Sequence, residues 1–176
     1  TMMDTPGMHI MADMPLTSPQ ALTTCPVTFR FRKTEMTDGN LWSPDYRPGT
    51  LIRVTKAAEA FPDGGREGFF KWMYSRCTLS RTDTVAQHHG VDEIWVKFYR
   101  CFRFVNSMLH YEPIYRRFLR RLMSLLKTDG VNYVELRFSW LLDYYSQDSE
   151  TPESDYTAMM DVLDEEVKAF QASEEG

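Results

Sequence analysis

The chain has 176 residues, of which 43% are apolar and 14% aromatic, and its 20 basic and 25 acidic side chains give a formal net charge of −5. This composition is sufficient for the core of one ordinary domain. The acidic balance argues against a nucleic-acid partner, because binding to a polyanion depends on Lys and Arg side chains that neutralise phosphates. No apolar run approaches the roughly 18 residues of a membrane-spanning helix, so no membrane span is predicted.

The first 26 residues are rich in Met, Thr, Ser and Pro and have no sustained period, which predicts a loop with at most one helical turn. They do not combine a charged stretch with an apolar one, so no signal peptide is predicted. Residues 27–33 alternate apolar with polar side chains, which predicts a half-buried strand. Residues 51–55 are predicted to add a second strand to the same small sheet.

Four later segments have the apolar spacing of amphipathic helices. They are residues 69–79, 91–109, 113–127 and 155–170. The predicted apolar face of the second helix consists of Ile94, Phe98, Cys101, Phe102, Val105 and Leu109. Pro113 is expected at the start of the third helix, where its missing N–H costs no hydrogen bond. The arginines of that helix, Arg116, Arg117, Arg120 and Arg121, are predicted to form a solvated face.

The segment after the third helix predicts a strand. Asp129-Gly130 stops the helix, since Gly tolerates the positive φ of a C-cap, and residues 131–138 then alternate with period two. Glu135 and Arg137 share one face of this apolar segment, so both are expected to be buried and paired, because unpaired buried charges are costly. Two interpretations stay open: a structural ion pair that fixes the register, or a position for Arg137 at the rim of an active site.

The run Asp-Gly-Val-Asn-Tyr-Val-Glu-Leu-Arg-Phe-Ser at 129–139 resembles the second barrel strand of the adenosine and AMP deaminase superfamily of metal-dependent hydrolases. Ile94-Trp-Val-Lys-Phe98 and Leu109-His-Tyr-Glu-Pro113, followed by a Tyr-Arg-Arg helix, resemble the secreted adenosine deaminases called adenosine deaminase-related growth factors. The resemblance implies a mostly helical α/β fold, an incomplete (β/α)8 TIM-barrel segment with an inserted small α+β subdomain. A closed barrel typically needs about 250 residues, so this chain is predicted to be too short to close.

The same resemblance implies three parts. Residues 1–16 would be a loop after a first barrel strand outside this chain, residues 17–76 the inserted subdomain, and residues 77–176 barrel helices with one barrel strand at 131–138. In relatives the insertion is associated with cell-surface partners, which implies a protein partner. An extracellular location is implied on the same ground.

In the complete family, a zinc-bound water converts adenosine to inosine and ammonia, and zinc serves by lowering the pKa of that water. The family uses a His-x-His pair, a His-Ala-Gly-Glu stretch, a further histidine and a Ser-x-Asp-Asp element, and none occurs in this sequence. By resemblance, the pair would lie upstream of Thr1 and the others beyond Gly176. We therefore predict no catalytic residue, no metal ligand and no zinc for this chain, and no deaminase activity for it alone.

The histidines and cysteines present give no metal-binding motif. Adjacent imidazoles such as His88-His89 seldom reach one metal, and His110 is expected to form hydrogen bonds at a helix end. The absence of a CxxC pair excludes a zinc-finger or thioredoxin motif. Cys25 and Cys77 could form a disulfide if the protein is exported.

For substrate binding, the resemblance implies that Trp95, Lys97, Phe98 and Phe102 approach the nucleoside, with Trp95 closing over the pocket. The alternative for Trp95 is an ordinary core aromatic. Two functions stay open: a fragment of a zinc-dependent adenosine deaminase, or a non-catalytic protein-interaction module or pseudo-enzyme. A plainer alternative is an unstable chain with unpaired strand edges.

Overall fold

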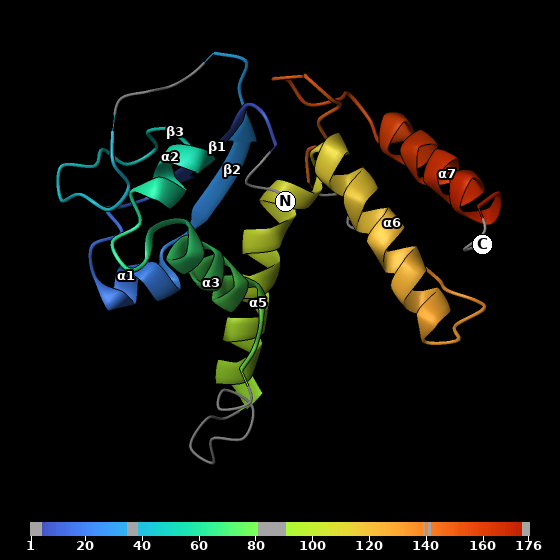
Figure 1. The fold of residues 1–176 in the computed structure, drawn as a ribbon, viewed down its shortest axis with the longest axis horizontal. Coiled ribbons are helices and arrows are strands. Elements are labelled where there is room, and N and C mark those ends of the chain that lie inside the picture. Colours follow the sequence, from blue (N-terminus) through green and yellow to red (C-terminus); the bar gives the residue numbers. More distant parts are fainter. Residues whose placement is uncertain (1–4, 35–38, 81–90, 139, 141, 174–176) are drawn as a thin grey trace. The chain divides into compact units, whose positions relative to one another are not determined.

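The computed structural model describes residues 5–34, 39–80, 91–138, 140 and 142–173 (Figure 1). The chain divides into two compact units, Thr1–Met108 and Leu109–Gly176. The fold is mixed α/β and roughly half helical, with one small sheet among the described residues. Within the same residues, none of the helices has both the length and the apolar character needed to cross a membrane.

The first unit contains a short sheet and four helices in its described part. Its strands are β1 (Met8–Ala12), β2 (Val27–Phe31) and β3 (Ile52–Arg53). Its helices are α1 (Pro19–Thr24), α2 (Val54–Glu59), α3 (Gly65–Cys77) and α5 (Val91–Leu109), the last of which ends one residue into the second unit. The strand predicted at 27–33 is therefore confirmed. The one predicted at 51–55 is only two residues long, because the chain turns into α2 at Val54.

Strand β1 lies in the middle of the sheet, which has the order β2-β1-β3 with antiparallel pairs. Ile10 faces Phe29 on one side and Ile52 on the other. Four of its five residues are buried, so neither face shows the apolar-polar alternation by which a half-buried strand is recognised. The prediction of a loop over the first 26 residues is wrong at Met8–Ala12 for this reason.

Aromatic side chains fill the core of the first unit. The Trp42 ring meets Phe61 edge to face at 4.8 Å between centroids and Trp72 at 5.5 Å. Its indole Nε1 donates to the carbonyl oxygen of Ala57 (2.8 Å), so the buried polar atom has a partner. Phe104 of α5 extends this core, with its ring 5.8 Å from Trp72. Helices α3 and α5 are thus joined through one aromatic cluster.

Tyr46 ties the loop between β2 and β3 to the central strand. Its hydroxyl oxygen accepts the backbone N–H of Ala12 (3.0 Å) and donates to the carbonyl oxygen of Thr50 (2.7 Å). Burial raises the pKa of the phenol, so it stays neutral at physiological pH. A buried hydroxyl thereby satisfies an N–H that the short strand β3 does not pair.

Helix α5 is present as predicted, but it buries a different face. Its buried residues are Phe104 and Met108, whereas Phe98 and Phe102 of the predicted apolar face are 39% and 50% exposed. Aromatic residues lie on both sides of this helix, so the sequence spacing alone does not decide which side turns inward. The contact of Phe104 with Phe29, at 5.4 Å and near a right angle, comes from a strand far away in the sequence.

The second unit is built from α6 (Glu112–Thr128) and α7 (Thr157–Gln171), which lie side by side (Figure 1). Both helices and the proline in the first turn of α6 agree with the predictions. The core of this unit consists of Tyr115, Leu119, Tyr144, Met159 and Val162. Backbone hydrogen bonds from Glu112 to Tyr145 and from Tyr145 to His110, both 2.9 Å, fix the start of α6 against the 142–146 segment.

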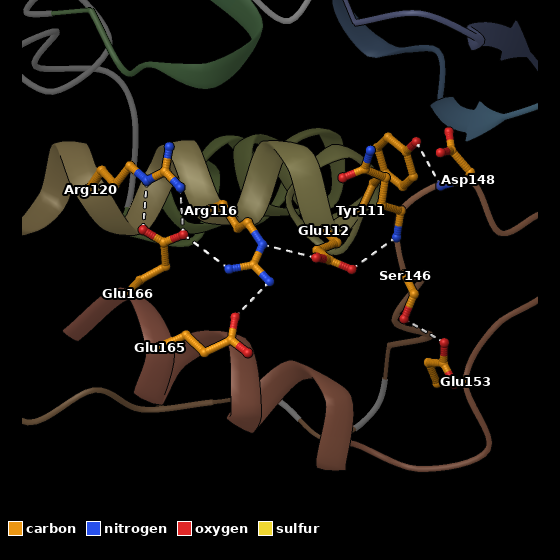
Figure 2. A network of polar contacts seen from close by, with 10 residues as sticks. Tyr111, Glu112, Arg116, Arg120, Ser146, Asp148, Glu153, Glu165 and Glu166 are labelled. Carbon is orange, nitrogen blue, oxygen red and sulfur yellow. Dashed lines mark hydrogen bonds and ion pairs between the residues drawn. The ribbon is translucent and has the colours of Figure 1, made fainter. Parts of the chain in front are cut away.

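An ion cluster joins α6 to α7 (Figure 2). The Glu166 carboxylate, 4% exposed, accepts Nε and Nη2 of Arg120 at 2.6 and 2.7 Å and Nη1 of Arg116 at 3.1 Å. Arg116 also reaches Glu112 and Glu165, each at 2.9 Å. The prediction of a simply solvated arginine face is thus wrong for Arg116 and Arg120, because their carboxylate partners come from a helix nearly 50 residues later.

Residues 131–138 form no regular secondary structure, so the strand predicted there is wrong. Gly130, with φ of 75°, does end the helix as expected. No strand of the described chain pairs with this segment, and Glu135 and Arg137 are exposed rather than buried. Alternation predicts a strand only where a neighbour supplies the hydrogen-bond ladder. The barrel segment and the three-part division stay predictions.

Candidate functional site

The residues predicted to contact substrate lie on α5. Trp95, Phe98 and Phe102 are spaced by three and four residues, so they form one stripe along the helix. The rings are in contact, with centroids 5.6 Å apart for Trp95 and Phe98 and 4.7 Å apart for Phe98 and Phe102. We call these three residues the aromatic stripe.

The aromatic stripe faces outward in the first unit. Trp95 is 63% exposed, so the alternative that it is an ordinary core aromatic is wrong for this structure. Flat, exposed rings supply large contact area at low entropic cost, and they suit stacking against a purine base or packing against an apolar partner. The geometry therefore supports a binding surface, and both kinds of ligand fit its chemistry.

Lys97 does not share this surface. It follows Trp95 by two residues, which is about half a helical turn, and it lines a cavity with Arg76, Arg100 and Cys101 on the other side of α5. The four residues predicted as one substrate wall thus divide into an aromatic side and a basic side. The grouping by sequence neighbourhood missed this because adjacent helical residues point in different directions.

The sequence predicts that no histidine, cysteine or carboxylate of this chain ligates a metal. No cluster of three or more His, Cys, Asp or Glu that could hold a metal occurs in residues 5–34, 39–80, 91–138 and 142–173. His88 and His89 lie outside the described residues. The Nδ1–H of His9, buried in β1, donates to the carbonyl of Gly7 (2.8 Å).

Strand β1 has a histidine at one position and a methionine two residues later. Residues two apart on a strand face the same side, so a His-x-His pair presents two imidazoles to one point. His9 and Met11 have this spacing, but zinc sites are ordinarily built from Cys, His, Asp and Glu. This strand therefore offers one imidazole where such a pair would offer two.

In the second unit, His110 is half-buried and poorly suited to carry charge. Burial lowers its pKa, and backbone hydrogen bonds at Leu142 and Asp143 offset this only in part. Its Nδ1 has no hydrogen-bond partner, and the same holds for the buried hydroxyls of Tyr115 and Tyr144. Burial raises the pKa of Tyr115 to about 12. These groups are neutral at physiological pH.

Glu135 and Arg137, predicted either to form a structural ion pair or to place Arg137 at an active-site rim, are not paired with each other in this structure. The Glu135 carboxylate instead accepts the hydroxyl of Tyr133 (2.8 Å) on the same exposed segment. The rim role stays a prediction. The three thiols are free, and burial raises the pKa of Cys77 to about 11, which keeps it protonated and weakly nucleophilic.

Comparison with known proteins gives a distant relationship. The chain is 28% identical over 111 residues to an adenosine deaminase of Phlebotomus duboscqi, a match that covers 62% of this chain and 19% of the relative. It is 27% identical over 102 residues to an adenosine deaminase of Lutzomyia longipalpis, covering 58% of this chain and 19% of the relative. No family model matches the chain. The chain spans about a fifth of the length of the curated relatives that it matches, and it is distantly related to adenosine deaminases over that part.

Proposed function

We propose that this chain is an adenosine deaminase-like segment of the growth-factor type that supplies part of a nucleoside-binding wall and does not deaminate adenosine by itself. The observation that carries the proposal is the partial similarity to two adenosine deaminases. The aromatic stripe of α5 is the part of the described chain whose chemistry suits a purine, since exposed rings stack on bases.

Hydrolytic deamination needs an activated water and a group that moves protons. In the complete family zinc would supply the first by lowering the pKa of bound water. A zinc-binding His-x-His pair on β1 would need histidines two residues apart. This chain has His9 at one such position and Met11 at the other. The proposed role is therefore binding without turnover, in a segment whose complete relatives act on adenosine.

The activity arm of the test uses the full chain with added zinc and follows the change in adenosine absorbance. We expect no turnover above buffer, while an active adenosine deaminase serves as the positive control. Turnover by this chain would contradict the inactivity that we propose and would leave the family relationship intact.

The binding arm measures quenching of tryptophan fluorescence by adenosine. We expect saturable quenching that Trp95→Ala weakens by about tenfold to a hundredfold, because stacking of one base on an aromatic ring contributes about 1–3 kcal/mol. Phe70→Ala is the matched control, since it removes another exposed ring, on α3. Equal loss in both variants, or no saturable binding, would refute the nucleoside wall.

A second candidate function is a non-catalytic interaction module or pseudo-enzyme that docks on a protein. Exposed aromatic rings favour it, because such rings are enriched at protein interfaces. Phe70 and Tyr74 on α3, 52% and 65% exposed, lie within the predicted insertion. Capture of one defined protein that is lost in Phe70→Ala/Tyr74→Ala and retained in Trp95→Ala would favour this function over nucleoside binding.

A further inference from the structure

A cavity of about 130 Å³ in the first unit is lined by three arginines. It lies where the end of α1 and the start of β2 meet α3 and α5, and its basic lining consists of Arg76, Arg100 and Arg103. Thr24 and Thr28 add hydroxyl-bearing side chains, and Pro26, Val27 and Phe104 complete the wall. No Asp or Glu is among the described residues that line it.

Arg76 is held in place by its surroundings. Its side chain is 8% exposed, its Nη1 donates to the carbonyl oxygen of Leu22 and its Nη2 to that of Cys25, both at 2.8 Å. The guanidinium also lies 5.2 Å from the ring centre of Phe104. Carbonyl oxygens and a ring face orient the group without neutralising it. A buried, fixed and unneutralised cation is therefore present at the cavity.

Arg100 and Arg103 bring two further positive charges to the same place. They are three residues apart on α5, so they point to one side of the helix. Neither makes a hydrogen bond or an ion pair with another described residue, and both are exposed. Arg76 and Arg100 line the same cavity. Burial lowers the pKa of Arg76, Cys25 raises it, and the charge of Arg100 lowers it.

We propose that Arg76, Arg100 and Arg103 form a binding pocket for a tetrahedral oxyanion, a phosphate group. Charges of one sign repel each other unless a counter-charge lies between them, and a dianion offers more compensation than chloride. Guanidinium groups also match the oxygen geometry of phosphate with paired hydrogen bonds. One buried and two exposed arginines give a rigid base with an open entrance.

The size of the cavity limits the ligand. Pockets that enclose a whole drug-sized molecule have volumes of about 300–1,000 Å³, so 130 Å³ accommodates a small group and not a nucleoside. The phosphate group comes either from free inorganic phosphate or from a small phosphate monoester whose remainder stays outside. This pocket is separate from the aromatic stripe, and it does not depend on the proposed nucleoside wall.

The test is calorimetric titration of the full chain with inorganic phosphate and with phenyl phosphate, at constant ionic strength against chloride. We expect a dissociation constant in about the millimolar range. Arg100→Gln/Arg103→Gln should weaken binding by about tenfold or more, because charge-assisted hydrogen bonds to the anion are lost. Arg66→Gln/Lys71→Gln removes two positive charges of α3 elsewhere in the first unit and should change the affinity by less than about twofold.

The two probes identify the source of the phosphate group. Equal affinity for both means that the free anion is sufficient, and tighter binding of phenyl phosphate assigns the pocket to a monoester. The preference of the unsubstituted chain for phosphate over chloride tests the pocket without relying on any variant. No saturable heat with either probe, or an equal loss of affinity in the two double variants, would overturn the proposal.

Discussion

Replacement of Glu166 by Gln should loosen the packing of α7 on α6. Glu166 is 4% exposed, and its carboxylate accepts three hydrogen bonds from Arg116 and Arg120. The substitution keeps the size of the side chain and removes its negative charge. The neutral amide then lies between two guanidinium groups. Its NH2 group cannot accept the arginine N–H hydrogen bonds that the carboxylate oxygen in its place accepted.

The expected cost follows from the burial of each partner. Breaking a fully buried ion pair costs about 3–5 kcal/mol, and an exposed pair contributes about 0.2–1 kcal/mol. Glu166 is buried, but the side chains of Arg116 and Arg120 are 26% and 64% exposed, so water replaces part of what they lose. We therefore expect a loss of about 2–3 kcal/mol, which corresponds to roughly 30- to 150-fold in an opening equilibrium.

Amide hydrogen exchange of the full chain measures this locally. Peptides from Glu112–Thr128 and Thr157–Gln171 should exchange faster in Glu166→Gln, while peptides from α3 in the first unit should not change. Glu165→Gln is the matched control, since its carboxylate is 62% exposed and accepts one bond from Arg116. Equal exchange in the two variants would refute the argument that burial makes Glu166 the important carboxylate.

Three further predictions concern pH and the first unit. Hydrogen bonds from Arg120 chiefly, and from Arg116, lower the pKa of Glu166 below its ordinary value of 4.5. The protection of α6 and α7 against amide exchange should thus be constant above about pH 4.5 and fall as the pH drops through the lowered pKa. In Glu166→Gln this protection should change less between neutral and acid pH, which exchange measured at graded pH would show. Tyr46→Phe should destabilise the first unit by about 1–3 kcal/mol in urea unfolding, because Ala12 N–H loses its partner; an unchanged midpoint would contradict this. Gly68→Ala should lower the melting temperature, since a Cβ there would lie 1.6 Å from the backbone oxygen of Asp63, and a variant as stable as the parent would show that the backbone yields without cost.

The four longer helices, α3, α5, α6 and α7, could be predicted from the sequence, and their contacts could not. Residues 113–127 have polar and apolar sides that are clearly separated, and α6 forms there with Tyr115 and Leu119 buried. In α5, by contrast, aromatic residues surround the helix, and Phe104 is buried because Phe29 and Trp72 lie opposite it. The outcome is decided by partners that are distant in the sequence, which the spacing within one helix does not contain.

The strands show the same division. β2 alternates and was found, because one of its faces is less buried than the other. β1 is buried on both faces and reads as a Met-rich loop. Residues 131–138 alternate between apolar and polar side chains, but no strand of the described chain pairs with them. An alternation of period two was therefore not sufficient to predict a strand.

For the candidate site, the role of the predicted residues stays a prediction, but the structure shows how they are grouped. Trp95, Phe98 and Phe102 do form one surface, while Lys97 belongs with the arginines on the other side of α5. The importance of Arg76 was missed. It is one of several charged residues of α3, so the sequence gives no sign of its role. The carbonyl oxygens that accept its hydrogen bonds are those of Leu22 in α1 and of the C-cap residue Cys25, about 50 residues earlier.

The position of β1 has a practical consequence for anyone who shortens this protein. Of the three described strands, the one that comes first in the sequence, β1, pairs with both others, since β2 and β3 each pair with β1 and not with each other. A gene cut after Ala12 would leave two short extended pieces with no partner and would uncover Ile52 and Phe29 together. Expression designs should therefore trim elsewhere.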